Sequence, residues 1–86
     1  MENIAYIGIG SNLGDRLNNC QKAIGLISMV SGTEILAVSA FYETEPVDCE
    51  AQPWFINCVI KVKTGLSAKE LFSSLMEIEK RMGRRK

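Results

Sequence analysis

The stretch from Trp54 to Lys63 alternates between two kinds of side chain along its whole length. Successive side chains of a β-strand point to opposite faces, so this alternation predicts a strand with one face in a core and the other outside it. The predicted core face carries five apolar or cysteine side chains: Trp54, Ile56, Cys58, Ile60 and Val62. The chain therefore has to build a sheet around this strand.

Two more strands and a helix precede this segment. The apolar run Ile4–Ile9 predicts a strand covered by helices on at least one face, and Ile35–Tyr42, rich in β-branched and aromatic residues, predicts another. Between them, apolar side chains three or four residues apart predict a helix from Asp15 to about Ser31. Its predicted buried stripe is Leu17, Cys20, Ile24, Ile27 and Val30.

A second helix is predicted after the alternating strand. Ser67 and Glu70 have the spacing of a capping box, and Gly83 is a typical C-terminal stop. The element order is then β-α-β-β-α, which makes up most of a split β-α-β unit. We expect an α+β fold over residues 1–86 as a single domain: a ferredoxin-like antiparallel sheet with helices on one face and the final strand missing. That strand would pair beside Ile4–Ile9, so this edge is expected to be open or paired with another molecule.

Composition argues against several classes of protein. No apolar run approaches the ~18 residues of a membrane span, and no signal-peptide pattern opens the chain, so we expect a cytoplasmic protein without membrane association. Three cysteines without C-x-x-C spacing predict neither a disulfide framework nor a zinc site. Cys20 and Cys58 are predicted core residues. Histidine is absent, so catalysis would need carboxylates, basic groups, a metal or positioning.

The formal net charge of zero hides an uneven distribution. Half of the ten basic residues fall within the last seven positions: Lys80, Arg81, Arg84, Arg85 and Lys86. These cations either complement the negative pole of the last helix or form an end that meets anions. Nucleic-acid binding is not predicted, because the cations are confined to one helix end and lack aromatic platforms beside them.

A glycine-rich turn follows the first strand. Gly8, Gly10 and Gly14 have the spacing G-x-G-x-x-x-G, which does not match a dinucleotide-binding fingerprint, and the lysine of a P-loop is lacking. Gly10 allows a tight turn, and Asp15 can cap the helix that follows. The turn can therefore be explained by structure alone.

The outer face of the alternating strand begins with Phe55 and Asn57. An aromatic plane beside a carboxamide suits a flat heterocycle, because one group stacks and the other offers a donor and an acceptor along the ring edge. The preceding polar segment, from Thr44 to Pro53, is typical of a binding loop. The alternative is that Phe55 packs under this loop and Asn57 bonds its backbone.

Three blocks together resemble the N-terminal half of the 6-hydroxymethyl-7,8-dihydropterin pyrophosphokinase family. They are A-Y-I-G-I-G-S-N-L-G-D-R, then S-A-F-Y-E-T-E-P with Q-P-W-F-I-N, then E-K-R-M-G-R-R-K, and they span essentially the whole chain. The resemblance implies an α+β ferredoxin-like core and the magnesium-dependent transfer of the β,γ-diphosphate of ATP to the hydroxymethyl group of the pterin in folate biosynthesis.

The resemblance also implies roles for particular residues. On the pterin side, Thr44 and the backbone near Val47 would meet the polar edge of the ring, Asn57 would hydrogen-bond the ring and Phe55 would stack on it. The glycines Gly8 and Gly10 would give the backbone room in the pocket wall. On the ATP side, the matching residues are Glu79 and Arg84, and Arg85 and Lys86 would begin a basic loop over ATP. Glu45 and Asp48 depart from residues frequent in the family's pterin loop.

The resemblance places the Mg²⁺ ligands and the metal-dependent chemistry beyond residue 86, in a D-x-D segment. Neither a catalytic residue nor a metal ligand is therefore predicted within this chain, and the 86 residues alone are expected to be inactive. Two other functions stay open. One is a pterin-binding remnant without turnover. The other is a ferredoxin-like assembly domain that forms a homodimer through its exposed edge strand.

Overall fold

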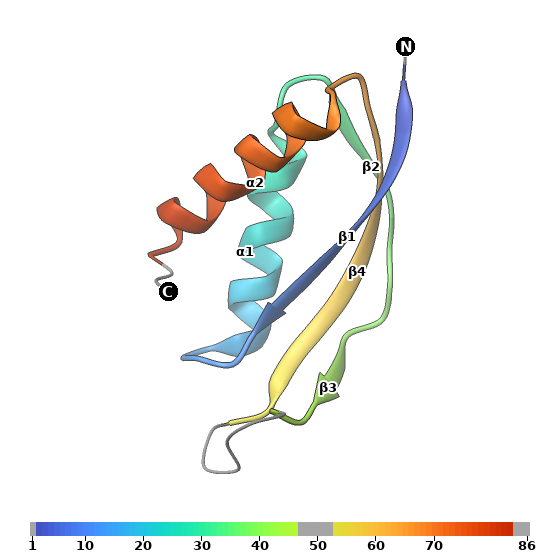
Figure 1. The fold of residues 1–86 in the computed structure, drawn as a ribbon. Coiled ribbons are helices and arrows are strands. Elements are labelled where there is room, and N and C mark those ends of the chain that lie inside the picture. Colours follow the sequence, from blue (N-terminus) through green and yellow to red (C-terminus); the bar gives the residue numbers. More distant parts are fainter. Residues whose placement is uncertain (1, 47–52, 84–86) are drawn as a thin grey trace.

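The computed structural model describes residues 2–46 and 53–83 and shows an open antiparallel sheet with two helices. The elements in chain order are β1 (Asn3–Ser11), α1 (Arg16–Ser28), β2 (Thr33–Val38), β3 (Tyr42–Thr44), β4 (Phe55–Thr64) and α2 (Ala68–Arg81). Both helices lie on the same side of the sheet (Figure 1). The predicted α+β class is thereby confirmed.

Strand β4 is the centre of the sheet. The strand order is β1-β4-β2, and the short strand β3 pairs with β4 as well, always antiparallel. Strand β1 follows β4 along its whole length, from the pair Asn3–Thr64 to the pair Ser11–Ile56. Among the described residues, β1 has a strand neighbour on one side only. The ferredoxin-like assignment needs a further strand beside β1 and stays a prediction.

The single strand predicted over Ile35–Tyr42 is wrong, because this segment forms parts of two strands, β2 and β3. The register of β2 against β4 shifts between Ile35 and Ala37, which marks a bulge. Directly after β2, the backbone N–H of Ser39 donates to the carbonyl of Val59, and the Ser39 hydroxyl accepts from the N–H of Val59. A side chain thus takes the place of a main-chain acceptor, which ends the regular ladder there.

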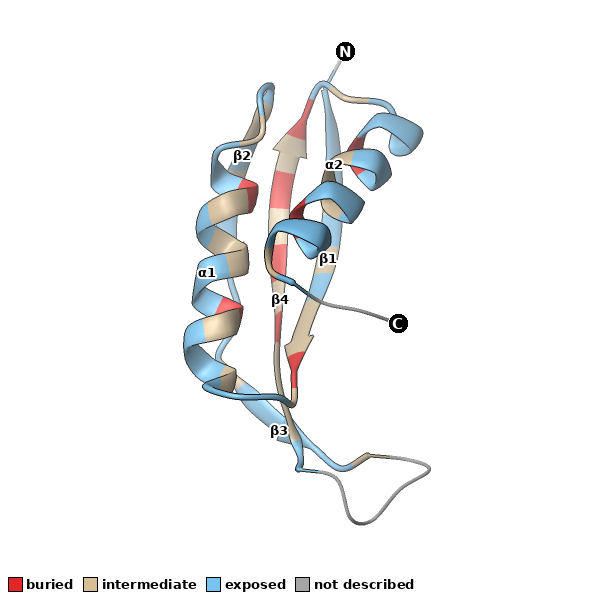
Figure 2. Cartoon of the chain, turned by 90° about the vertical axis from the view of Figure 1, so that its left-hand side faces the viewer, coloured by how far each residue is buried: buried red, intermediate tan, exposed pale blue. Residues whose placement is uncertain are grey.

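The core lies between the two helices and the inner face of β4. Four buried side chains form one cluster at its centre: Ile27, Ile60, Val62 and Ile78. Figure 2 shows buried residues recurring along β4 beneath the helices. Cys20 and Cys58 are each 1% exposed, which confirms them as core residues. The predicted alternation is confirmed from Cys58 onward, but Trp54, predicted on the core face, precedes β4 and is 47% exposed. Leu17, predicted in the buried stripe of α1, is likewise exposed, at 45%.

Hydrogen bonds confirm the predicted N-terminal ends of both helices, whereas α1 ends at Ser28, before its predicted end at about Ser31. Ser67 accepts from the backbone N–H of Glu70 over 3.1 Å, and the Glu70 carboxylate accepts from the N–H of Ser67 over 2.8 Å, completing the capping box. Asp15 accepts from the N–H of Asn18 at the start of α1. Gly83 takes a φ of 75° after Met82, the C-cap residue of α2, as is typical of a helix stop. Across the described ranges, neither helix has the length and apolar character to cross a membrane.

Candidate functional site

Gly10 of β1 and Asn57 of β4 stand directly opposite each other in the sheet. A Cβ atom at position 10 would lie 2.5 Å from the side-chain oxygen of Asn57, closer than such atoms approach. The missing side chain at Gly10 therefore gives the Asn57 amide its place on the sheet surface. At Gly8, an added Cβ would meet nothing within 4 Å, so no contact within the described protein requires glycine at this position.

The amide nitrogen of Asn57 donates a hydrogen bond of 2.6 Å to the hydroxyl of Thr44. This bond is possible because β3 pairs with β4, which sets Thr44 opposite Phe55 and Tyr42 opposite Asn57. Opposite residues share a face of the sheet. We call Thr44, Phe55 and Asn57, together with Gly10, the ring platform. The platform lies on the face of β4 that is opposite to the buried Cys58.

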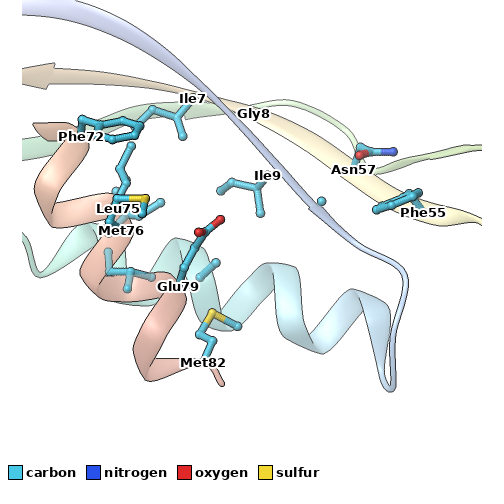
Figure 3. A pocket seen from close by; sticks show the side chains of 14 residues that line it. Ile7, Gly8, Ile9, Phe55, Asn57, Phe72, Leu75, Met76, Glu79 and Met82 are labelled. Carbon is cyan, nitrogen blue, oxygen red and sulfur yellow. The ribbon is translucent and has the colours of Figure 1, made fainter. Parts of the chain in front are cut away.

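A pocket of ≈ 430 Å³ along β1 is lined both by residues of the ring platform and by residues of α2. Five of the predicted site residues line it: Gly8, Gly10, Phe55, Asn57 and Glu79. Figure 3 shows Phe55 and Asn57 at one end and Glu79 extending from α2 toward β1. The rest of its wall is mainly apolar, with Ile7, Ile9, Phe72, Leu75, Met76 and Met82. The structure thus brings residues predicted for the pterin side and the ATP side around one cavity.

A second hollow, of ≈ 630 Å³, adjoins the first at the glycine-rich turn. It shares Gly10 and Phe55 with the first and is also lined by residues 11–14 of the turn. Sequence reasoning missed Asn19, whose side chain donates to the carbonyl of Leu13 over 2.9 Å and to the Ser11 hydroxyl over 3.3 Å. Asn19 thereby fixes the turn that forms this wall, and its position one turn after Asp15 was the available signal.

Arg16 is a second residue that sequence reasoning missed. Its Nη1 atom donates to the backbone carbonyl of Trp54 over 2.7 Å and lies 3.3 Å from a carboxylate oxygen of Glu43. Arg16 begins α1, whereas Glu43 and Trp54 directly precede Thr44 and Phe55 of the ring platform. The only signal in the sequence is a cation beside the Asp15 cap, which does not specify these partners.

The remaining predicted site residues are not all placed. Thr44 does not line either cavity and reaches the site through its bond to Asn57. Val47 and Arg84 lie outside the described residues, as do Asp48, Arg85 and Lys86. Within the described residues the Asn57 amide bonds the Thr44 side chain, and the predicted alternative, a bond from Asn57 to the loop backbone, concerns a loop that lies largely outside them.

Titration and ligand geometry limit the chemistry of the described residues. Burial raises the pKa of the Cys58 thiol above its ordinary value, and the nearby Cys20 acts in the same direction, so Cys58 stays a neutral thiol at neutral pH. Within residues 2–46 and 53–83, no three histidine, cysteine, aspartate or glutamate side chains are grouped so that they could hold a metal ion. What the arrangement offers is an aromatic plane at Phe55 beside a carboxamide at Asn57, groups that could bind a flat ring with a polar edge.

Comparison with known proteins gives a consistent family match. The model of the 7,8-dihydro-6-hydroxymethylpterin-pyrophosphokinase family matches residues 6–86. The 2-amino-4-hydroxy-6-hydroxymethyldihydropteridine pyrophosphokinase of Bacillus subtilis is 40% identical over 84 residues, which cover 98% of this chain and 50% of that protein. The enzyme of the same name from Haemophilus influenzae is 38% identical over 80 residues, covering 93% and 50%.

A plant protein shows the same similarity. A folate synthesis bifunctional protein of Arabidopsis thaliana is 44% identical over 78 residues, which cover 91% of this chain and 16% of that protein. The chain thus spans about half the length of the two bacterial relatives and a smaller share of the bifunctional one.

Proposed function

The chain belongs to the 7,8-dihydro-6-hydroxymethylpterin-pyrophosphokinase family, and on this basis we propose that it serves diphosphate transfer from ATP to 6-hydroxymethyl-7,8-dihydropterin in folate biosynthesis. In this reaction the hydroxymethyl oxygen of the pterin forms a bond to the β-phosphorus of ATP. The bond from that phosphorus to the oxygen bridging to the α-phosphate breaks, and AMP leaves. The hydroxyl proton passes to a base or to solvent.

The ring platform is the observation that supports the pterin side of this proposal. Phe55 offers an aromatic plane for stacking, and Asn57 offers a carboxamide beside it. One N–H of the Asn57 amide is held by Thr44, which leaves the second N–H and the carbonyl oxygen for the ring. A pterin carries both donors and acceptors along its polar edge, so these two atoms match it.

The other proposed contacts follow the shape of the pocket. Gly8 and Gly10 border it without side chains, which leaves their backbone open to the ring. Glu79 lines the same pocket from α2, and we propose that it contacts the nucleotide. Arg84 would clamp a phosphate and Val47 would contact the pterin through its backbone, although both lie outside the described residues.

Magnesium enters this proposal only as an expectation. In phosphoryl transfer the metal neutralises charge that develops on the phosphates. The described residues do not offer a fitting set of ligands, so no step through Mg²⁺ is assigned to them. We propose instead that the ligands lie beyond residue 86 and that this chain alone binds the pterin without completing the transfer.

The proposal can be tested with the 86-residue chain by two measurements. Trp54 is the only tryptophan and precedes Phe55, so its fluorescence can follow titration with 6-hydroxymethyl-7,8-dihydropterin. AMP release from ATP and Mg²⁺ can be followed in parallel, with and without the pterin. We expect saturable binding and no pterin-dependent AMP. Absence of binding would overturn the pterin assignment, and pterin-dependent AMP would overturn only the incompleteness of the chain.

A homodimer through β1 is a second proposal. It is supported by the free edge of β1 within the described residues and by exposed apolar side chains beside it, such as Ile4 at 50% and Tyr6 at 68%. Sedimentation equilibrium over a range of protein concentrations is the test. A dimer that protects the backbone amides of β1 from hydrogen exchange supports this proposal, and a monomer at all concentrations contradicts it.

A further inference from the structure

Arg16 ties three separate parts of the chain together. It is the first residue of α1, and its Nη1 atom carries two N–H groups. This atom lies 2.7 Å from the Trp54 carbonyl oxygen, to which it donates, and 3.3 Å from a carboxylate oxygen of Glu43. One nitrogen of α1 thereby links the middle residue of β3 with the residue before β4. We call this contact the Arg16 clamp.

The residues held by the clamp are the immediate neighbours of the ring platform. Glu43 precedes Thr44, Trp54 precedes Phe55, and Thr44 and Phe55 are paired across the two strands. Side chains alternate between the faces of a strand, so the Glu43 carboxylate points away from the face that carries Thr44 and Phe55. The Arg16 clamp therefore contacts the strands on the face opposite to the ring platform and does not cover the side chains of Thr44 and Phe55.

We propose that Arg16 is a positioning residue for the ring substrate, which it does not touch. This inference rests on the proposed function, because it assigns Arg16 a role in pterin binding. By fixing Trp54 and Glu43 relative to α1, Arg16 keeps Phe55 and Thr44 in register. Thr44 in turn orients the Asn57 amide through its 2.6 Å hydrogen bond. Arg16 thus affects the bound ring indirectly, because it keeps Phe55, Thr44 and Asn57 in fixed positions.

A surface ion pair without function is the alternative to be excluded. The side chain of Glu43 is 51% exposed and that of Arg16 is 31% exposed, and exposed pairs contribute little to stability. The shorter contact is the one to a backbone carbonyl, and it holds the chain next to Phe55 rather than a mobile side chain. If Arg16 is a positioning residue, its removal changes the Asn57 amide signals and weakens pterin binding. If it only forms a surface ion pair, its removal changes neither.

The test compares four single variants of the 86-residue chain. Arg16→Ala removes both contacts, Glu43→Gln removes only the charge of one partner, and Arg16→Lys keeps the positive charge without the planar group. Lys22→Ala is the matched control, because Lys22 is an exposed cation of the same helix. The measurements are the side-chain amide signals of Asn57 in the ligand-free protein, by ¹⁵N NMR, and the Kd of 6-hydroxymethyl-7,8-dihydropterin by Trp54 fluorescence.

Arg16→Ala is expected to shift the Asn57 amide signals and to raise the Kd about fivefold to thirtyfold, less than the loss of a fully buried charge-assisted hydrogen bond because the Arg16 contacts are partly exposed. Glu43→Gln is expected to have a smaller effect, Arg16→Lys to recover part of the affinity, and Lys22→Ala to match the wild type. Wild-type values for both the Asn57 signals and the Kd in Arg16→Ala would overturn the inference. If that variant does not fold, Glu43→Gln and Arg16→Lys decide by the same two readouts.

The two proposals fail in different ways. A wild-type chain that does not bind the pterin refutes the proposed function. In that case the NMR comparison still decides whether Arg16 orders the platform, since it is made without ligand. Shifted Asn57 signals in Arg16→Ala then support the clamp, and unchanged signals overturn it.

Discussion

The Asn57 amide of β4 donates to the Thr44 hydroxyl of β3 across 13 positions of sequence, over a distance of 2.6 Å. The bond lies on the surface, where water competes for both groups, so its contribution to stability is small. Its effect is to fix the orientation of the carboxamide: the nitrogen faces Thr44 and the oxygen faces Gly10. Asn57 is thereby ordered before a ring arrives.

Replacing Thr44 with valine tests this orientation. Thr44→Val keeps the shape of the side chain but removes the acceptor, so the Asn57 amide is free to rotate. We expect the pterin Kd to rise about fivefold to tenfold, equivalent to about 1 kcal/mol, with little change in the thermal midpoint. Thr44→Ser keeps the hydroxyl and serves as the control. Equal affinities of the valine and serine variants would contradict the role of the bond.

Replacing Gly10 with alanine tests the space on the other side of Asn57. The new Cβ would lie 2.5 Å from the Asn57 oxygen, so the amide has to turn away and break its bond to Thr44. We expect at least about a tenfold loss of pterin affinity, with a modest loss of stability because a flexible side chain can yield. Gly8→Ala is the matched control for folding, since its Cβ meets nothing within 4 Å. Unchanged affinity in Gly10→Ala would contradict the proposed site.

Replacing Phe55 with leucine tests stacking on the ring. Leucine keeps an apolar side chain but removes the aromatic face, and stacking of a base on an aromatic side chain contributes about 1–3 kcal/mol. We expect a loss of pterin affinity of about tenfold, whereas Phe55→Tyr should bind nearly as well as the wild type. Calorimetric titration of the three proteins measures this. A leucine variant that binds as tightly as the tyrosine variant would mean that Phe55 only packs under the neighbouring chain.

Replacing Glu79 with glutamine separates the two sides of the pocket. Glu79 lines the same cavity as Phe55 but extends from α2 (Figure 3). If it serves the nucleotide, Glu79→Gln weakens ATP binding about threefold to tenfold, the range for a hydrogen bond to a charged group that is partly exposed, and leaves the pterin Kd unchanged. Both constants can be measured by titration of the same sample. A loss of pterin affinity alone would move Glu79 to the pterin side.

The buried Cys58 thiol predicts a dependence of stability on alkaline pH. Burial raises its folded-state pKa above the ordinary value of 9.0, so the unfolded chain loses this proton first as the pH rises. The protonated Cys58 thiol contributes its full stability at pH values below the pKa of the unfolded chain. This contribution is lost as the pH rises through the pKa of the folded protein. We expect the difference in unfolding free energy between the wild type and Cys58→Ala to narrow in the alkaline range above pH 9.0. A difference that stays constant over this range would contradict the raised pKa.

Much of the fold could be predicted because it depends on local patterns. Residues close together in the sequence determine three features that the structure confirms: the alternation of β4, the cap at Asp15 and the capping box at Ser67. The break between β2 and β3 could not be predicted in this way. It depends on Ser39, which bonds Val59 twenty positions away, and no local propensity marks Ser39 as the end of a strand.

The candidate site likewise contains some residues that could be predicted from the sequence and others that could not. The type and spacing of Phe55 and Asn57 indicated a ring-binding surface, and resemblance added Thr44, Gly8 and Gly10. Asn19 and Arg16 were not predicted, because their importance comes from contacts that only the folded chain makes. For Arg16 the partner is a backbone carbonyl 38 positions away, which leaves no trace in the identity of residue 54.

The central place of β4 also has a consequence for how the protein is made. Strands β1, β2 and β3 each pair with β4, and in the described part of the chain they do not pair with one another. During synthesis the first strand leaves the ribosome without a partner and has to wait until Phe55–Thr64 has emerged. Pairing over such a long separation is slow and exposes the early strands to other chains. The residues that form the ring platform are therefore ordered late in folding, when β4 closes the sheet.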